Sequence, residues 1–180
     1  MKDRRRSPHD AVACPGCGLV EEGDASGSVH AYMSTGAVCW GLFSQLLAEL
    51  GPEATRLATD AYAAQHPFGR EDDRRQRQSV AVHLTALCLH VENRVREKQL
   101  RRMMTSLSRL VLPRLEVPEW PMLASPSDLG QVTVGDVDRA GPEERPQVIE
   151  EWASSVWAAW AEEHDTVRGW AALALSAYGR

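Results

Sequence analysis

Apolar side chains recur at intervals of three and four residues along most of this sequence, and that spacing restricts the chain to a largely helical fold. Residues at those intervals share one face of an α-helix, because the helix completes a turn every 3.6 residues or so. The longest stripe consists of Val80, Leu84, Leu87, Cys88, Val91 and Val95. We predict a helix over residues 76–98 that buries this stripe in the core.

Five further segments have the same periodicity, and some of them end at residues that interrupt helices. Pro67 disfavours helical geometry in the residue before it, and Gly51 and Pro113 each follow an apolar stripe. The predicted ranges are 34–50, 52–66, 100–112, 146–164 and 166–178, of which the last two could form one long helix. We therefore expect an all-α protein, with a single helical domain of about five to six helices over residues 13–180.

The segment 113–147 differs from its neighbours in composition. It holds six of the ten prolines together with several Gly and Ser residues, and proline lacks the backbone donor that a helix interior uses. We interpret it as an extended Pro-rich crossing segment with at most a short strand or a turn of helix around Val132–Val137. Trp120 and Leu123 are expected to hold it against the core.

The N-terminal region lacks the periodicity of the rest. Residues 1–12 are interpreted as a flexible arm, and residues 13–36, which are rich in Gly, Ser and Pro, as turns and loop. Such a loop contributes little to a hydrophobic core. Its order therefore needs an outside constraint, such as a bound metal ion.

Charge and hydropathy restrict the compartment and the partners. The net charge of −5 argues against wrapping nucleic acid over the whole surface, and we interpret the basic run Arg94–Arg114 as a solvated helix face. No stretch approaches the roughly 18 consecutive apolar residues of a membrane-spanning helix, and Met1–Asp10 has no apolar run to serve as a secretion signal. We expect a cytoplasmic protein whose partner is another protein, with neither nucleic acid nor membrane, and the oligomeric state stays open.

Cys14, Pro15, Gly16 and Cys17 form the strongest chemical signal in the chain. Two thiolates separated by two residues can bind one metal ion, and glycine permits the tight turn that this needs. In a reducing compartment such a pair more often holds metal than forms a static disulfide. We predict a structural zinc ion; the alternatives are idle thiols and a redox pair, the latter weakened because no strand is predicted before the motif.

A structural zinc ion takes four ligands, so two more must come from elsewhere in the chain. His30 and Cys39 are the nearest candidates, and with Cys14 and Cys17 they would connect the loop to the start of the first helix. The helix dipole favours a thiolate at that position. Cys39 also shares the apolar stripe of its helix, so the competing interpretation is a small buried core residue.

His66 and His83 form a second group of candidate ligands. His66 closes one predicted helix and His83 lies in the next, at the border of its apolar face, so antiparallel packing could bring the two imidazoles together. In the plainer interpretation His66 caps its helix and His83 is a hydrogen-bonded core histidine. In the alternative they complete the cysteine site in place of the previous pair, or form a separate metal site with His164.

Five short motifs follow one another along the first half of the chain. They are Cys14-Pro15-Gly16-Cys17-Gly18, His30-x-Tyr32, Ser34 to Cys39-Trp40, Asp60-x-Tyr62-x-x-Gln65-His66-Pro67 and Gln78-Ser79-Val80-x-x-His83-Leu84. In this order they resemble a family of short bacterial proteins catalogued only as a domain of unknown function. The similarity extends through Val132–Val137 and Trp152–His164, which covers most of the chain. The resemblance implies no activity, but it implies that some of the scattered cysteines and histidines converge on one metal ion.

Two functions are compatible with these residues. We predict a zinc-stapled helical protein that works as a binding or regulatory module through another protein. The competing prediction is a metal-dependent enzyme of the hydrolase or transferase type, in which His66 and His83 hold an ion with an open position for water. Tyr62 or Asp60 would assist proton transfer there. The geometry of the metal site distinguishes the two functions. Four protein ligands close a structural site, whereas a catalytic site keeps one position open for water.

Overall fold

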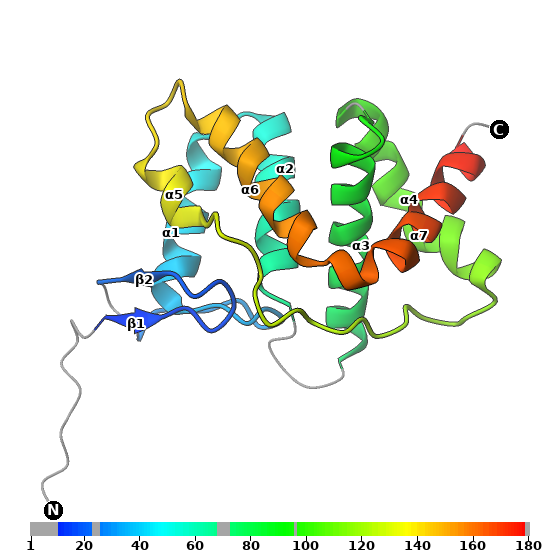
Figure 1. Ribbon diagram of the computed structural model, residues 1–180, viewed down its shortest axis with the longest axis horizontal. Coiled ribbons are helices and arrows are strands. Elements are labelled where there is room, and N and C mark those ends of the chain that lie inside the picture. The colour runs from blue at the N-terminus through cyan, green and yellow to red at the C-terminus, as the bar shows by residue number, and fades with distance from the viewer. Residues whose placement is uncertain (1–10, 23–25, 68–72, 96, 179–180) are drawn as a thin grey trace, which may run out of the picture.

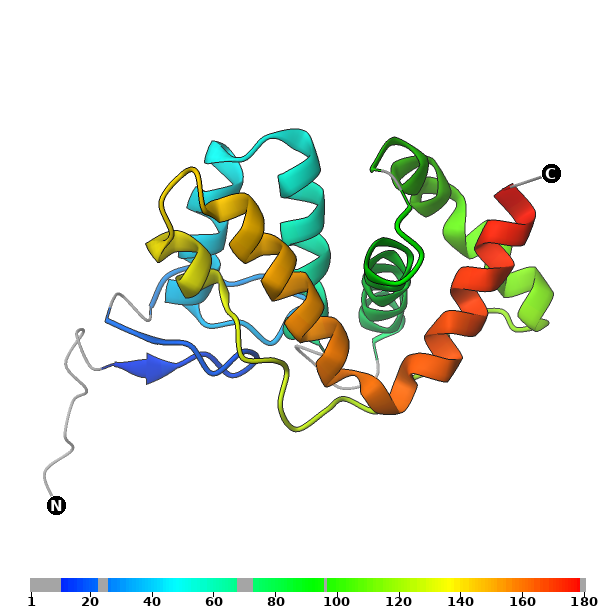
Figure 2. The ribbon, with the colours of Figure 1, turned by 45° about the horizontal axis from the view of Figure 1, so that its top comes forward.

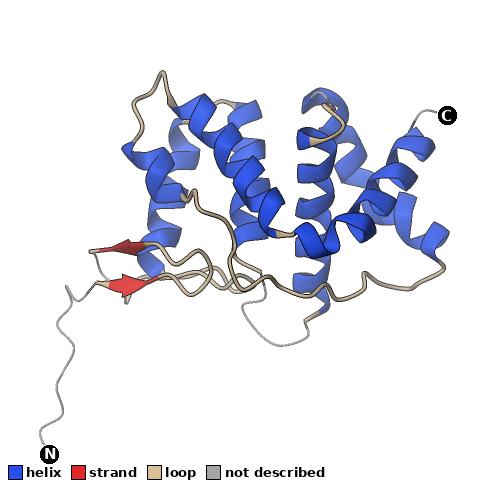
Figure 3. Ribbon diagram, viewed as in Figure 1, coloured by secondary structure: helices blue, strands red, loops and turns tan. Residues whose placement is uncertain are grey.

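The computed structural model describes residues 11–22, 26–67, 73–95 and 97–178, and α-helices dominate it (Figure 1, Figure 3). Within these residues the α-helices are α1 (Ala37–Glu49), α2 (Pro52–Gln65), α3 (Arg74–Val91), α4 (Glu97–Leu115), α5 (Val134–Arg139), α6 (Arg145–Ala159) and α7 (His164–Tyr178). A short 3-10 helix, η1 (Ala161–Glu163), lies between the last two. The all-α prediction is confirmed. None of the described helices combines the length and the apolar character that crossing a bilayer requires.

The helices enclose a core that is rich in aromatic side chains. In both ribbon views α1, α2, α5 and α6 lie on one side of the molecule and α3, α4 and α7 on the other (Figure 1, Figure 2). The two sides meet where α2 packs against α3, while α7 packs against both α3 and α4. The largest fully buried side chains include Trp120, Trp152, Trp160, Tyr62 and Leu84. Each large apolar side chain stabilises the fold by roughly 1.5–3 kcal/mol when buried, so these helix contacts carry most of the stability.

Helix α3 ends earlier than its apolar stripe suggested. The prediction of one helix over residues 76–98 is wrong, because the chain turns back before α4 begins. Arg94 adopts a positive φ of 52°, and the Val95 amide donates to the Leu89 carbonyl at 3.0 Å. Val95 is thereby buried in the core. Val95 therefore reaches the same core as the apolar stripe of α3, but through a tight turn and not through a continuous helix.

Helix α4 runs through Pro113, where the sequence predicted an end. Proline lacks the backbone N–H that a helix interior uses, but Pro113 is exposed and lies in the last turn, which ends at Leu115. The Val117 amide then donates to the Leu112 carbonyl at 3.3 Å. The loss of one hydrogen bond in a solvated last turn costs too little to stop the helix.

The last two helices are separate, and two aromatic residues fix the bend between them (Figure 2). His164 stacks on Trp157 with ring centroids 3.9 Å apart, and its Nε2 donates to the Trp157 carbonyl at 2.8 Å. Trp160 donates from Nε1 to the Ala64 carbonyl at 3.1 Å. Because of the bend, α6 lies against α2 while α7 lies against α3 and α4.

The crossing segment, residues 113–147, contains the predicted turn of helix, which is α5. Trp120 and Leu123 are buried and hold the segment against the core, as expected. Asp136 caps the start of α5, where its carboxylate accepts from the Thr133 amide at 2.7 Å and from the Thr133 hydroxyl at 2.8 Å. Burial raises the pKa of Asp136, but these hydrogen bonds and the Arg139 guanidinium outweigh it, so the pKa lies below its ordinary value.

Gln65 connects the crossing segment to the helices from the C-terminal end of α2. Its side-chain amide donates to the carbonyls of Leu129 at 3.1 Å and Val132 at 2.8 Å. Its side-chain oxygen accepts from Trp152 Nε1 at 2.8 Å. Gln65 is fully buried, so removal of its amide would leave these partners without their hydrogen bonds.

A β-hairpin precedes the helices. Strand β1 (Val12–Ala13) pairs antiparallel with β2 (Val20–Glu21), with Val12 opposite Glu21 and Ala13 opposite Val20. The sequence predicted turns and loop here, because strands of two residues are too short to show the alternation that marks a strand. Residues 1–10 of the predicted arm lie outside the described residues, and Val12 already belongs to β1.

We expect Gln65→Ala to lower the free energy of unfolding by about 2–4 kcal/mol, because each buried group left unpaired costs about 1–3 kcal/mol. Urea denaturation followed by circular dichroism measures the change. Gln45→Ala, at an exposed position on α1, is the matched control and should leave the midpoint nearly unchanged. A Gln65→Ala protein as stable as this control would contradict the role assigned to Gln65.

Glu92 connects the end of α3 to α6 and α7. Its carboxylate accepts from Arg168 at 2.8 and 2.9 Å and from Trp157 Nε1 at 2.9 Å. The hydrogen bond from Arg168 lowers the pKa of Glu92 below its ordinary value. A lowered carboxyl pKa stabilises the folded state above the ordinary titration range, and that stabilisation is lost as the pH falls through the lowered pKa.

Glu92→Gln should therefore be less stable than the wild type at neutral pH, and the difference should shrink as the solution is acidified below the ordinary carboxyl range. Urea midpoints of both proteins across this pH range provide the measurement. Glu143→Gln changes an exposed carboxylate and should show no such trend. A difference for Glu92→Gln that is the same at acidic and neutral pH would rule out this contribution.

Candidate metal centre

The first two candidate ligands lie on the turn that joins the strands of the hairpin. The Cys14 amide donates to the Leu19 carbonyl at 2.8 Å, and the Gly18 amide donates to the Cys14 carbonyl at 2.9 Å. Gly18 has a φ of +72°, a conformation that favours glycine. The turn therefore presents Cys14 and Cys17 from one compact loop. It leads into a second strand and not into a helix, which differs from the strand-to-helix setting expected of a redox pair.

Gly16 lies where the turn contacts the rest of the protein. A Cβ at this position would be 2.5 Å from the Ser34 carbonyl oxygen and 2.6 Å from His66 Cδ2. Both distances are shorter than any normal contact of a side-chain carbon. Only glycine lets the turn approach His66 so closely.

Cys39 belongs to the first turn of α1 and is buried, with 2% of its surface exposed. The helix dipole favours a thiolate at this end of a helix. Just before the helix, the Gly36 amide donates to Cys14 Sγ at 3.3 Å. The start of α1 thus provides one sulfur and one hydrogen bond to another.

His66 follows the last residue of α2 and precedes Pro67. Its Nδ1 donates to the Tyr62 carbonyl at 2.7 Å, which leaves Nε2 unprotonated in the neutral ring and 3.4 Å from Cys39 Sγ. The Ser34 amide donates to the His66 carbonyl at 3.2 Å, and the Ser34 hydroxyl donates to the Pro67 carbonyl at 2.7 Å. The segment before α1 and the end of α2 therefore hold each other in place.

Four donor atoms meet between these elements. The sulfurs of Cys14, Cys17 and Cys39 and a ring nitrogen of His66 all lie within 4.8 Å of one another, and Cys17 Sγ is 3.7 Å from Cys39 Sγ. Thiolates are soft donors and imidazole is a borderline one, and both suit transition metals, so the cluster could hold a metal ion. The part of the chain that the structure describes contains no second group of three or more such donors.

The two cysteines of the turn respond in opposite directions to the cluster. Hydrogen bonds with Cys17 and Cys39 lower the pKa of the Cys14 thiol below its ordinary value, whereas hydrogen bonds with Cys14 and Cys39 raise the pKa of Cys17. Burial lowers the pKa of His66, but hydrogen bonds to Cys14 and Cys39 outweigh it and raise the pKa to about 9. The surroundings therefore stabilise a positive charge at this position, as metal binding requires.

Tyr62 forms a second layer around the cluster. Its ring stacks on Phe43 at 3.9 Å and on His66 at 4.0 Å between centroids, and its hydroxyl is 3.5 Å from Cys39 Sγ. The hydroxyl also shares a short hydrogen bond with Thr35. Burial raises the pKa of Tyr62 above its ordinary value. The phenol thus stays protonated and positions the donors; it is not suited to accept a proton.

His30 does not join the cluster. Its ring packs 5.0 Å from the Trp40 ring, and its Nδ1 accepts from the Tyr32 amide at 3.3 Å. In sequence, His30 is the first histidine after the Cys14 pair. Its aromatic neighbours place it beside the first turn of α1 instead of among the sulfurs.

His83 does not join the cluster either. It packs against α2 as the sequence suggested, but its Nδ1 is 2.7 Å from the Asp60 carboxylate instead of close to His66. The third candidate, His164, is the first residue of α7 and contacts Trp157 instead of the cluster. The structure thus brings one candidate from each of the two alternative pairs close to Cys14 and Cys17, Cys39 from the first pair and His66 from the second.

The fold and the cluster together define a small α-helical protein with a Cys3His group able to bind a metal ion. The chain belongs to a family of unknown function, DUF5946, whose model matches residues 12–161. This match confirms the resemblance to a domain of unknown function and includes all four residues of the cluster. Neither a curated protein nor a solved structure matches the chain.

Gly16→Ala should weaken metal binding about tenfold or more, because the added methyl group forces the turn away from His66 and disturbs the ligand positions. Cobalt(II) titration, followed by the charge-transfer absorption of thiolate ligands, measures the affinity. Gly41→Ala is the control, since a Cβ there would have no atom within 4 Å and should leave the affinity unchanged. Equal affinities for the two variants would contradict the close approach at Gly16.

Proposed function

We propose that Cys14, Cys17, Cys39 and His66 bind a structural zinc ion, and that the protein works as a binding or regulatory module through another protein. The convergence of four donors from three separate elements carries this proposal. The hairpin turn supplies two of them, and α1 and the end of α2 supply one each. When bound, the ion supplies four strong bonds that connect these elements.

The donor set and its spacing support zinc. Zinc is bound tetrahedrally by cysteine and histidine, with zinc–sulfur bonds of about 2.3 Å, which place two sulfurs about 3.8 Å apart. The same geometry places a sulfur about 3.6 Å from a ligating nitrogen. The distances of 3.7 Å from Cys17 Sγ to Cys39 Sγ and of 3.4 Å from Cys39 Sγ to His66 Nε2 are close to these values.

The surroundings support a structural role over a catalytic one. A catalytic zinc keeps one position open for water, whereas here four protein donors face one another and three of them belong to buried residues. The competing enzyme requires His83 beside His66, and His83 is engaged with Asp60 instead. The hydrogen bond from His66 Nδ1 to the Tyr62 carbonyl is the outer contact that zinc-bound histidines generally make.

The ion would order the part of the chain that the hydrophobic core holds least well. Strands of two residues have almost no stability of their own, and among the hairpin residues whose burial the structure describes only Cys14 belongs to the buried core. Metal binding adds its free energy to the folded state alone, so it offsets the entropy of ordering this region. A structural site of this kind stabilises the surface formed by the hairpin but carries out no reaction itself. The protein would then act through partners that bind this surface.

Purified protein should contain zinc in about a one-to-one ratio by elemental analysis, since four protein ligands complete one tetrahedral ion. Cys14→Ser, Cys39→Ser and His66→Ala should each lose most of it. His30→Ala and His83→Ala are the matched controls and should retain it, because neither residue joins the cluster. Retention of zinc in His66→Ala together with its loss in His83→Ala would reverse the ligand assignment.

A structural role for the zinc ion also predicts that the thermal stability of the protein depends on the ion. Removal of the ion by a chelator should lower the melting temperature, and added zinc should restore it. The helical content near room temperature should change little, because the core among α2, α3, α6 and α7 contains none of the ligands except His66 at the end of α2. A melting temperature that does not respond to the chelator would contradict the structural role.

A further inference from the structure

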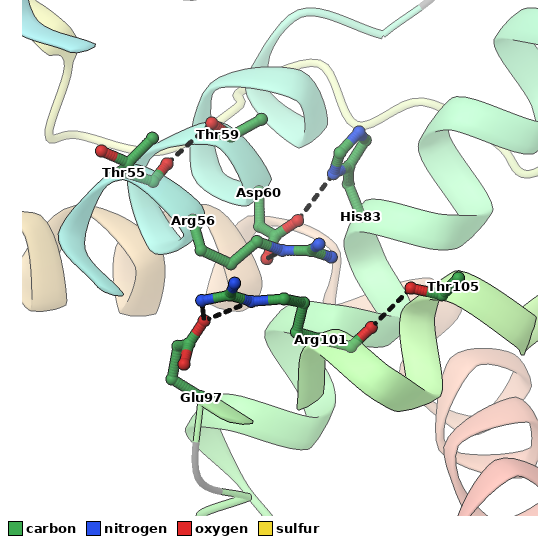
Figure 4. A network of polar contacts seen from close by, with 8 residues as sticks. All are labelled: Thr55, Arg56, Thr59, Asp60, His83, Glu97, Arg101 and Thr105. Carbon is green, nitrogen blue, oxygen red and sulfur yellow. Dashed lines mark hydrogen bonds and ion pairs between the residues drawn. The ribbon is translucent and has the colours of Figure 1, made fainter. Parts of the chain in front are cut away.

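Asp60 is a buried charge outside the metal centre. It lies on α2 with 1% of its surface exposed, and its carboxylate accepts from Arg56 Nε at 2.8 Å and from His83 Nδ1 at 2.7 Å (Figure 4). A buried carboxylate is costly unless it is paired. Arg56, one turn earlier on the same helix, already provides the compensating charge. The contact with His83 therefore has a further effect, which is to orient the imidazole.

The orientation of His83 directs its second nitrogen away from Asp60. Because Nδ1 faces the carboxylate, Nε2 lies on the opposite side of the ring, as Figure 4 shows. No hydrogen bond to Nε2 occurs within the described residues. His83 is partly exposed and lines a surface hollow of about 270 Å³. The buried carboxylate thus fixes an imidazole that presents one free nitrogen to this hollow.

Mostly polar side chains line the hollow. Besides His83 it is formed by Arg75, Gln78, Ser79 and Val82, whose spacing of three and four residues places them on one face of α3. A guanidinium, an amide, a hydroxyl and an imidazole therefore surround the same space, and none of the lining residues is a carboxylate. The Arg75 guanidinium is already positioned there, 5.2 Å above the centre of the Tyr32 ring, and donates to the Tyr32 hydroxyl.

We propose that this hollow binds a phosphate group, either as free phosphate or as the monoester of a small molecule. A guanidinium pairs with phosphate oxygens through two parallel donors, and the Gln78 amide and the Ser79 hydroxyl match the remaining oxygens. Because His83 Nδ1 donates to Asp60, Nε2 of the neutral ring is an acceptor, which matches the hydroxyl group of a protonated phosphate. A carboxylate has only two oxygens and would leave some of these donors without a partner. Asp60 acts as a positioning residue, because it reaches the ligand only through His83. The site shares no residue with the proposed zinc centre and does not depend on it.

The test is an NMR titration of the full-length, metal-loaded protein with inorganic phosphate, observed at the histidine ring nitrogens. The His83 Nε2 signal should shift and saturate, while His90, on the same helix and bonded to Glu150, should not move. Sodium chloride at matched ionic strength should have no effect. A shift that does not saturate, or that chloride reproduces, would overturn the proposal.

Variants distinguish phosphate binding in the hollow from a nonspecific effect of removing a positive charge. Arg75→Gln should weaken phosphate binding about tenfold, because a charge-assisted pair is lost. Arg102→Gln removes an exposed arginine on α4 and is the matched control, with binding unchanged. Equal weakening by both variants would overturn the proposal.

Ser79→Ala and Asp60→Asn test the remaining contacts. Ser79→Ala keeps the proposal testable if the buried Asp60 variant is unstable, and it should weaken binding severalfold while leaving the melting temperature unchanged. Asp60→Asn should weaken binding and also broaden the His83 signal, because the ring loses its fixed orientation. Unchanged binding in Ser79→Ala and Arg75→Gln together would overturn the site.

A parallel titration with phenyl phosphate identifies the source of the phosphate group. Binding at the same residues assigns the site to monoesters, and exclusion of phenyl phosphate with retention of inorganic phosphate assigns it to the free anion. Failure of both ligands would overturn the proposal. Zinc content measured before and after titration distinguishes that failure from a failure of the metal site.

Discussion

The hydrogen bond from His66 Nδ1 to the Tyr62 carbonyl is the contact on which the N-terminal part of the structure depends. This hydrogen bond holds the His66 ring so that Nε2 faces the sulfurs of the three cysteines in the cluster. The backbone carbonyl of His66 accepts a hydrogen bond from the Ser34 amide. The neighbouring Gln65 side chain faces the other way and bonds the crossing segment and Trp152. The C-terminal end of α2 is thus the junction where the hairpin, the crossing segment and the helical core meet.

The helices could be predicted from the sequence because each carries its own apolar stripe, and a stripe is a local property. Where an end depended on tertiary contacts, the prediction was wrong. Val95 continues the stripe of α3 but reaches the core through a turn, and Pro113 is tolerated because its turn is exposed. The hairpin could not be predicted, since strands of two residues each are too short to show an alternating pattern of their own.

The ligands could be predicted only as a set of candidates, because spacing along a chain does not decide which side chains meet in space. Cys39 fits both of its interpretations at once, since it is buried in the core and also faces the cluster. His83 was placed correctly at the contact between α2 and α3, but the partner that meets it there is Asp60 and not His66. Asp60 and His66 lie between one and two helical turns apart, and the way that α2 and α3 pack decides which of them His83 meets. The proline after His66 was the available signal, because it fixes the histidine at the end of its helix.

The hairpin is so short that its ordered conformation depends on the elements it contacts. Two strands of two residues cannot persist alone, and Gly16 has no side chain that could interlock with a neighbour. Opening of this region is therefore independent of the large helix interfaces and belongs to the low-energy end of the molecule's motions. With the proposed ion bound, amide hydrogens of the hairpin would exchange with solvent at the rate at which that ion leaves, while those of α3 would exchange only when the whole molecule unfolds.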